Sequence, residues 1–269
     1  MIEIFLGLFV SLGIAIYAYT KGSLSKSGLV SAAIYGASLY FFGGIIFLLI
    51  MLCFFSSSSL LSKYKHGEKQ PLEVIHEKGD RRDYTQVIAN GLPSFIFAGL
   101  FYVTQNHGFI LGFATCLAAA NADTWASELG VLSQNKPVSI LTGKSVSNGM
   151  SGGVTTLGTL ASFLGGLFIA IVFISFSYFA YPELSNEIWI LLFLCTFGGF
   201  LGSIIDSVLG ASAQGIYKDM ENRFTEKRYS SSEENTLVRG FKVINNNLVN
   251  LLSGTISATL VVLIYFLVI

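Results

Sequence analysis

A long apolar run ends in the stretch Ala118-Ala-Ala-Asn121-Ala-Asp123-Thr124-Trp125-Ala-Ser127-Glu128-Leu-Gly130. A carboxylate inside a membrane helix is costly and usually faces a cavity, a pathway or a partner. Asp206 is the only other carboxylate set well inside an apolar run, and neither run contains a Lys or Arg. We therefore predict that Asp123, Glu128 and Asp206 form the acidic floor of one site. The competing interpretations are pairing of the aspartates with loop cations and, for Glu128, a simple position at the membrane interface.

The composition is that of a polytopic membrane protein. Of 269 residues, 52% are hydrophobic and only 12% are charged, and the mean hydropathy is +0.65. These values are too apolar for a soluble globular domain. The net charge of zero argues against a nucleic-acid partner, which would need a basic surface. We expect one multi-pass domain over residues 1–269, in contact with the lipid bilayer of the cell membrane.

Apolar runs of spanning length predict an all-α transmembrane bundle, because a crossing needs about 20 residues. Eight runs are found, at residues 3–20, 28–42, 44–61, 84–104, 109–129, 150–180, 188–208 and 244–268. The short second run and the join Phe42-Gly43-Gly44 leave open a kink in place of a turn. The segments 62–83, 130–149 and 209–243 are expected to be the longer cytoplasmic loops.

Lys and Arg set the expected orientation. They occur only at 21–26, 63–82, 136–144 and 218–242, so the positive-inside rule places these segments in the cytoplasm and both chain ends outside. Eight crossings satisfy this rule, whereas merging the second and third would break it. The fifth and seventh spans then end on the cytoplasmic side, where the fourth, sixth and eighth begin.

Each of those three beginnings is polar, so five spans bring polar residues to one face. The residues concerned are Arg82 and Asn90, then Lys144, Ser151, Gly152 and Gly153, and finally Asn245, Asn246, Asn247 and Asn250. Helix N-termini attract anions, so carboxylates, amides and cations together suit a metal-bound phosphate. Alternatively, the amides and glycines serve helix packing, and the arginine anchors lipid headgroups.

The ordered motifs resemble the domain-of-unknown-function 92 family of integral membrane proteins, which includes plant phytyl-phosphate kinase and animal transmembrane protein 19. Between residues 54 and 253 the resemblance rests on Phe54-Phe55-Ser56-Ser57, Arg82-Asp83, Gln86 to Gly91, Ala119 to Gly130, Lys144, Ser151-Gly152-Gly153, Gly202-Ser203, Asp206-Ser207, Leu209-Gly210-Ala211, Gln214, Asn245-Asn246 and Val249-Asn250. The chain departs from the family pattern at Asn148 and Met150, where Pro and Thr are expected. More distantly, it is similar to dolichol kinase and phosphatidate cytidylyltransferase.

The resemblance implies a Mg²⁺-dependent kinase that converts a prenyl monophosphate, such as phytyl, farnesyl or geranylgeranyl phosphate, to the diphosphate. The expected donor is a nucleoside triphosphate, CTP by likeness to the more distant enzymes. Asp123 and Asp206, with Glu128, would hold the metal, and Lys144 and Arg82 would offset phosphate charge. The remaining expected contacts to nucleotide or phosphate are Asn90, Asn121, Ser127, Ser151, Gly152, Gly153, Gln214, Asn245, Asn246 and Asn250.

Other functions fit parts of the same pattern. A cytidylyltransferase or a lipid-alcohol kinase would use the same metal and triphosphate. A small-anion transporter would also place acids in the membrane, but it should show paired repeats and a site near the midplane. The acidic floor instead lies toward one face, which favours the enzyme.

Overall fold

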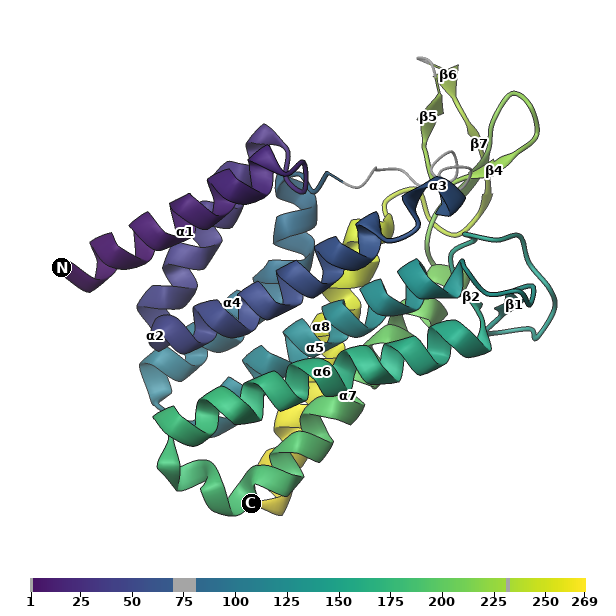
Figure 1. Cartoon of the computed structure of the whole chain (residues 1–269). Coiled ribbons are helices and arrows are strands. Elements are labelled where there is room, and N and C mark those ends of the chain that lie inside the picture. The colour runs from purple at the N-terminus through teal and green to yellow at the C-terminus, as the bar shows by residue number, and fades with distance from the viewer. Residues whose placement is uncertain (1, 70–80, 231–232) are drawn as a thin grey trace.

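The computed structural model describes residues 2–69, 81–230 and 233–269, and most of them are helical (Figure 1). The helices are α1 (Ile2–Thr20), α2 (Lys26–Lys63), α3 (His66–Lys69), α4 (Tyr84–Thr104), α5 (His107–Gly130), α6 (Thr156–Ala180), the 3-10 helix η2 (Pro182–Glu187), α7 (Ile188–Ser212) and α8 (Asn246–Val268). The prediction of an all-α membrane bundle is confirmed. Residues 70–80, within the expected loop 62–83, lie outside the described residues.

Five helical segments in the described part are long and apolar enough to cross a membrane: α2, α4, α6, η2 with α7, and α8. Two more apolar helices, α1 and α5, complete the bundle. α2 itself is two helices, because Gly43 and Gly44 leave helical geometry between them and Gly44 has a φ of +66°. The left-handed conformation favours glycine. Figure 1 shows the two halves meeting at a sharp bend, which supports the turn over a kink within one span.

α5 is the centre of the bundle. Of its 24 residues, 13 are buried, and it packs against α2, α4, α6, α7 and α8. A helix that is apolar on all sides is stable when other helices surround it. Phe113 of α5 stacks on Phe47 of α2 with ring centroids 4.2 Å apart. The apolar core therefore fixes α5, and with it the acidic stretch at its C-terminal end.

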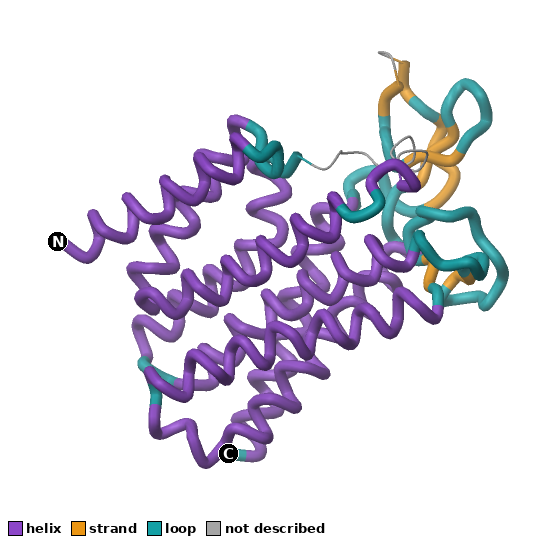
Figure 2. Tube along the Cα trace, viewed as in Figure 1, coloured by secondary structure: helices purple, strands orange, loops and turns teal. Residues whose placement is uncertain are grey.

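Short strands and loops gather at one end of the bundle, away from the labelled chain ends (Figure 2). The strands are β1 (Val138–Ser139), β2 (Gly153–Val154), β3 (Ile216–Lys218), β4 (Phe224–Thr225), β5 (Tyr229–Ser230), β6 (Glu233–Glu234) and β7 (Thr236–Arg239). They form antiparallel sheets in the orders β1-β2, β4-β3-β7 and β5-β6. We call residues 213–230 and 233–245 the cap, because they cover this end. Its assignment to the cytoplasm stays a prediction.

The expected start of the sixth span was wrong. α6 begins at Thr156 after its N-cap Thr155, and not near residue 150. Gly152 has a φ of +80°, and Gly153 pairs with Ser139 in the β1-β2 hairpin. The glycine turn therefore belongs to a hairpin that lies before the helix, and it does not open the helix.

Candidate functional site

Small residues bring α5 and α7 together in parallel, with one constant register. A Cβ atom at Gly198 or at Gly202 of α7 would collide with Thr115 or Ala119 of α5 respectively. Residues four apart lie on one helix face. One more turn along both helices therefore places Asp206 opposite Asp123, and the two carboxylates interact electrostatically. The prediction that the spans carrying these acids end at the same side of the bundle agrees with this register.

Neutral donors surround the acid pair. Ser203 hydrogen-bonds Asp123, and Ser253 Oγ donates to Oδ2 of Asp206 at 3.1 Å. With its amide turned to satisfy its neighbours, Asn250 donates to the same Oδ2 at 2.8 Å. The donors come from α7 and α8, so three helices converge on the two carboxylates.

In the described part of the chain, the acid pair has no cationic partner. Among the described residues, no Lys or Arg forms an ion pair with Asp123 or Asp206, and the Asp206 side chain is buried. Two adjacent charges of one sign in a region of low dielectric repel strongly. The geometry therefore favours a bound cation or a shared proton, and the described loop residues supply no cation that pairs with either aspartate.

A small cavity of about 10 Å³ lies against the pair. α4 contributes Asn90 and Pro93, and α8 contributes Asn250, Ser253 and Gly254. The space suits one water or one small ion. Its hydroxyl, amide and carboxylate oxygens are the hard ligands that Mg²⁺ prefers, and Mg²⁺ commonly takes one or two carboxylates together with substrate phosphates. The residues present therefore fit a magnesium ion.

Glu128 has a different environment. Its carboxylate accepts hydrogen bonds from Lys69 Nζ and from Ser62 Oγ, each at 2.6 Å. In the described part of the chain, no three His, Cys, Asp or Glu side chains gather closely enough to hold a metal. The prediction that Glu128 binds metal stays untested, but here its charge is already neutralised by Lys69.

Asn121 is held within the bundle. It is fully buried; its Oδ1 accepts from Ser57 at 2.8 Å and from Ser58 at 3.3 Å, and its Nδ2 donates to the Gly165 carbonyl at 2.8 Å. All of its polar atoms thus have partners on α2 and α6. The observed role is interhelical, which was the alternative to a site lining.

At the start of α4, Arg82 and Asn90 are separated by two helical turns and have different surroundings. Arg82 Nη1 donates to Ser59 Oγ at 2.9 Å, and the guanidinium lies over the Phe55 ring at 5.2 Å. Asp83 caps the helix in a reciprocal capping box with Gln86. Asn90 donates to the Gln86 carbonyl at 3.0 Å and also lines the cavity. Of the two site candidates, only Asn90 is placed at the acid pair.

The asparagines before and within α8 have separate roles. Asn245 is the N-cap and accepts from the amide of Leu248 at 3.1 Å. Asn246 begins the helix and offers its carbonyl to Asn250. Asn247 donates to Thr85 at 2.9 Å and so ties α8 to α4. Of these four asparagines, only Asn250 reaches the acid pair, and it lies about one helical turn after the N-cap residue Asn245.

The glycine turn lies over the C-terminal end of α7. A side chain at Gly152 would collide with Ala211, so glycine permits this close approach. Ser151 Oγ donates to Gln214 Oε1 at 2.7 Å. Arg239 of β7 donates to the carbonyls of Ser151 and Gly210, both at 3.1 Å. Gly210 lies one helical turn after Asp206, and Gln214 follows the end of α7, so this turn and β7 cover the end of the helix face that carries the acid.

Two buried donors at this junction lack partners. Within the described residues, Nε2 of Gln214 and Nε of Arg239 make no hydrogen bond. A buried donor without a partner costs about 1–3 kcal/mol. Glu226 of the cap, which is buried, interacts electrostatically with both Arg239 and Asp206. The cap therefore adds a cation, an amide and an acid near the site.

Lys144 and Ser127 are not brought to the acid pair. Lys144 lies on the exposed loop after β1, and in the described part of the structure its ammonium has no partner. Ser127 is exposed and donates to the carbonyls of Asp123 and Thr124 on its own helix. Their assignment to phosphate or nucleotide stays a prediction, and any such contact would have to form with the substrate.

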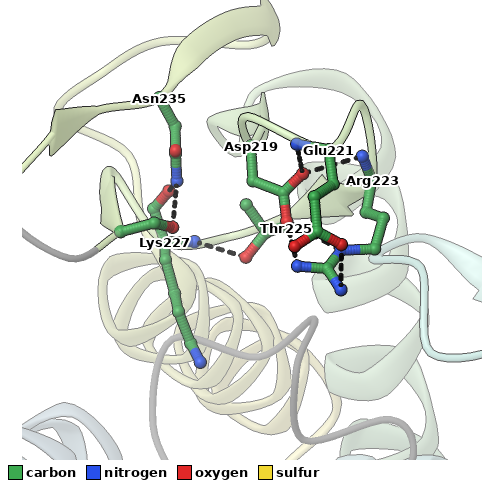
Figure 3. A network of polar contacts seen from close by, with 7 residues as sticks. Asp219, Glu221, Arg223, Thr225, Lys227 and Asn235 are labelled. Carbon is green, nitrogen blue, oxygen red and sulfur yellow. Dashed lines mark hydrogen bonds and ion pairs between the residues drawn. The ribbon is translucent and has the colours of Figure 1, made fainter.

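The outer part of the cap is a self-contained polar network (Figure 3). Asp219 accepts from the amides of Glu221 and Arg223, both at 2.9 Å, and pairs with the Arg223 guanidinium at 2.8 Å. The amide of Arg223, followed by its side chain and the Glu221 amide, lowers the pKa of Asp219. This network stabilises the turn between β3 and β4, and both oxygens of the Asp219 carboxylate have partners.

Sequence reasoning missed several residues that complete the site. They are Ser203 and Ser253, which donate to the acids; Ser57, Ser58 and Ser62, which bind Asn121 and Glu128; and Lys69, Glu226 and Arg239. Spacing held a signal for some: Ser203 precedes Asp206 by three residues, and Ser253 follows Asn250 by three, so each shares a helix face. No periodicity singles out Arg239 among the cap cations.

Comparisons with known proteins give one consistent group. A family model described as Integral membrane protein DUF92 matches residues 9–258. Protein PGR of Arabidopsis thaliana is 29% identical over 261 residues, which cover 89% of this chain and 88% of that protein. An uncharacterized membrane protein of Methanocaldococcus jannaschii is 30% identical over 212 residues, or 78% and 83% of the two chains. Protein VTE6, chloroplastic, of Arabidopsis thaliana is 23% identical over 246 residues, or 89% and 65%. No solved structure gives a significant match.

Proposed function

Because this chain belongs to the integral membrane protein DUF92 family, we propose that it is a membrane kinase of prenyl monophosphates. It transfers a phosphate from a nucleoside triphosphate, with CTP as the expected donor, to give the prenyl diphosphate. The observation that carries the proposal is the pair Asp123–Asp206, whose negative charge has no cationic partner among the described residues. The pair lies beneath the cap, where Nε2 of Gln214 and Nε of Arg239 are buried donors without a hydrogen-bond partner. The resemblance to phytyl-phosphate kinase supplies the reaction. We also propose that the protein lies in the cell membrane.

Asp123 and Asp206 would hold Mg²⁺, and Ser203, Ser253 and Asn250 would orient the two carboxylates. When bound, Mg²⁺ neutralises phosphate charge and aligns the donor with the acceptor. The acceptor is already an anionic phosphate oxygen, so the protein needs positioning and charge neutralisation more than a strong base. Gln214 and Arg239 would contact the nucleotide phosphates, and Arg82 and Lys144 would supply further positive charge at the capped end.

Direct assay tests the proposal. Purified protein in detergent is incubated with Mg²⁺, each nucleoside triphosphate and a panel of prenyl phosphates, and products are identified by mass spectrometry. We expect a prenyl diphosphate and a nucleoside diphosphate in equal amounts. A nucleotide-linked lipid with released pyrophosphate would identify a cytidylyltransferase, and phosphorylation of prenyl alcohols alone would identify a lipid-alcohol kinase. Either outcome would overturn the prenyl-phosphate assignment.

A further inference from the structure

An apolar groove of about 360 Å³ lies between α4 and α8. Its deeper side chains, Phe97 and Val262, are 7% and 5% exposed. Its rims are open: Leu100 of α4 is 39% exposed and Leu263 of α8 is 54% exposed. Hydrocarbon that enters between these rims would come directly from the bilayer, without passing the polar end of the bundle.

The groove adjoins the acid cavity. Pro93 lines both spaces, and on α8 the cavity residue Gly254 is followed by the groove residue Thr255. A side chain added at Gly254 would meet only Pro93, at 3.9 Å. Glycine therefore leaves open space where the polar cavity meets the apolar groove.

From this junction the groove runs away from the cap. Its lining extends to Leu100 on α4 and to Phe266 on α8, which is roughly 10 Å and 16 Å along the two helices at 1.5 Å per residue. At the far end Phe109 and Phe266 meet edge to face with centroids 5.8 Å apart. The lining thus changes from carboxylates and amides at one end to aromatic rings at the other.

We propose that this groove binds the hydrocarbon chain of the acceptor lipid, with its phosphate at the Asp123–Asp206 pair. The inference rests on the proposed function for the identity of the headgroup, and on the structure for the place of the chain. A linear lipid with a single anionic head matches this sequence of surfaces. The chain enters sideways between α4 and α8, and the residues at the far end of the groove set the preferred chain length.

Photolabelling tests the place of the chain independently of turnover. A prenyl monophosphate with a diazirine at the chain end is irradiated with the full-length protein and Mg²⁺ in nanodiscs, and labelled peptides are mapped. We expect labels on residues 96–100 and 259–266, which excess unlabelled prenyl phosphate removes. Labels spread over other lipid-facing helices, or labels that only bulk phospholipid displaces, would overturn the groove assignment.

Two substitutions test its consequences for specificity. Leu100→Trp fills the far end and should lower transfer to longer chains relative to shorter ones by about fourfold for each displaced methylene, equivalent to about 0.8 kcal/mol. Gly254→Leu closes the junction and should reduce chain-end labelling at least tenfold. Leu164→Trp on α6, where the leucine is 44% exposed and lines neither space, is the matched control and should leave the chain-length profile unchanged.

The outcomes separate this inference from the kinase proposal. Competed labelling of the groove without any phosphate transfer would retain the groove and refute the kinase. Transfer with a chain-length profile that Leu100→Trp and Gly254→Leu leave unchanged, in variants whose melting temperatures match the native protein, would do the reverse. Thermal stability of all three variants is measured in the same nanodiscs, so that misfolding is recognised directly.

Discussion

Asp206 in the bundle and Asp219 in the cap show two ways to place a carboxylate. Asp219 has two backbone donors and an arginine at 2.8 Å. Asp206 has only the neutral donors Ser253 and Asn250, and it faces a second acid. The carboxylate of Asp219 is neutralised within the protein, whereas the acid pair needs a bound cation or a shared proton to offset its charge. Mutations that replace each carboxylate by an amide should therefore differ in what they change.

The largest effect is expected at the acid pair. Asp123→Asn and Asp206→Asn should each lower phosphate transfer by at least about 100-fold, because the nearly isosteric amide cannot neutralise Mg²⁺. Both variants should remain folded, since no cation among the described residues pairs with either aspartate. Transfer rates and melting temperatures are measured together, with Asp219→Asn as the control. Near-normal turnover of either variant at saturating Mg²⁺ and nucleotide would remove that aspartate from the metal site.

A smaller effect is expected where a hydroxyl orients the acid. Ser253→Ala should raise the Mg²⁺ concentration for half-maximal transfer by about 10–100-fold, because groups that orient a metal ligand affect affinity on that scale. Ser253→Thr should restore part of the loss. Ser175→Ala, which removes only a hydroxyl bound to the Ile171 carbonyl, is the matched control. If Ser253→Ala changed the melting temperature but not the Mg²⁺ dependence, the serine would have only a packing role.

Glu128 is either neutralised within the protein by Lys69, like Asp219, or available to a metal ion, like the acid pair. Their side chains are 10% and 20% exposed, so Glu128→Gln should strand a partly buried ammonium and cost about 1–3 kcal/mol of unfolding free energy. The double variant Glu128→Gln with Lys69→Met should recover most of that loss. A denaturant titration of the four proteins gives the coupling energy. If the double variant is stable yet needs much more Mg²⁺, Glu128 is a metal ligand after all.

The smallest effect is expected at Asp219, and it should depend on pH. Because the pKa of Asp219 is lowered in the folded protein, its contribution to stability is present at neutral pH and is lost as the pH falls below the usual aspartate value of about 3.9. Amide exchange of residues 216–239, corrected for intrinsic rates, should show this acid-induced loosening in the native protein and not in Asp219→Asn. Transfer at neutral pH should stay within about twofold, since surface pairs contribute little. A larger loss would link the outer cap to the reaction.

Much of the bundle could be predicted from local sequence. The predicted spans 84–104, 109–129 and 244–268 agree with α4, α5 and α8 to within two residues at each end. The sixth helix was predicted to begin near residue 150, six residues too early, for a local reason. Gly149, Gly152 and Gly153 mark a break before the apolar run, but they do not indicate whether a helix or a hairpin is formed there. The strands of the cap are two to four residues long, which is too short for an alternating pattern to reveal them.

The site was predictable in part, for a physical reason. Unpaired acids in apolar runs stand out in a sequence, so Asp123 and Asp206 could be chosen without a structure. Amides give no such signal: Asn121 and Asn250 have the same chemistry, yet one ties α5 to α2 and α6 while the other reaches Asp206. Rotation of each helix about its axis decides between these roles, and packing against neighbouring helices sets that rotation.

By itself, the sequence determined that the chain is a helical membrane bundle with acids near one end, because a backbone in hydrocarbon must satisfy its own hydrogen bonds. Only the tertiary structure decided that Asp123 and Asp206 face each other, that Lys69 neutralises Glu128, and that Arg239 covers the end of α7. In the sequence, Asp123 and Asp206 are 83 positions apart, Lys69 and Glu128 are 59 apart, and Arg239 and Gly210 are 29 apart. Contacts over such separations depend on close packing of small residues between helices, which no local pattern specifies.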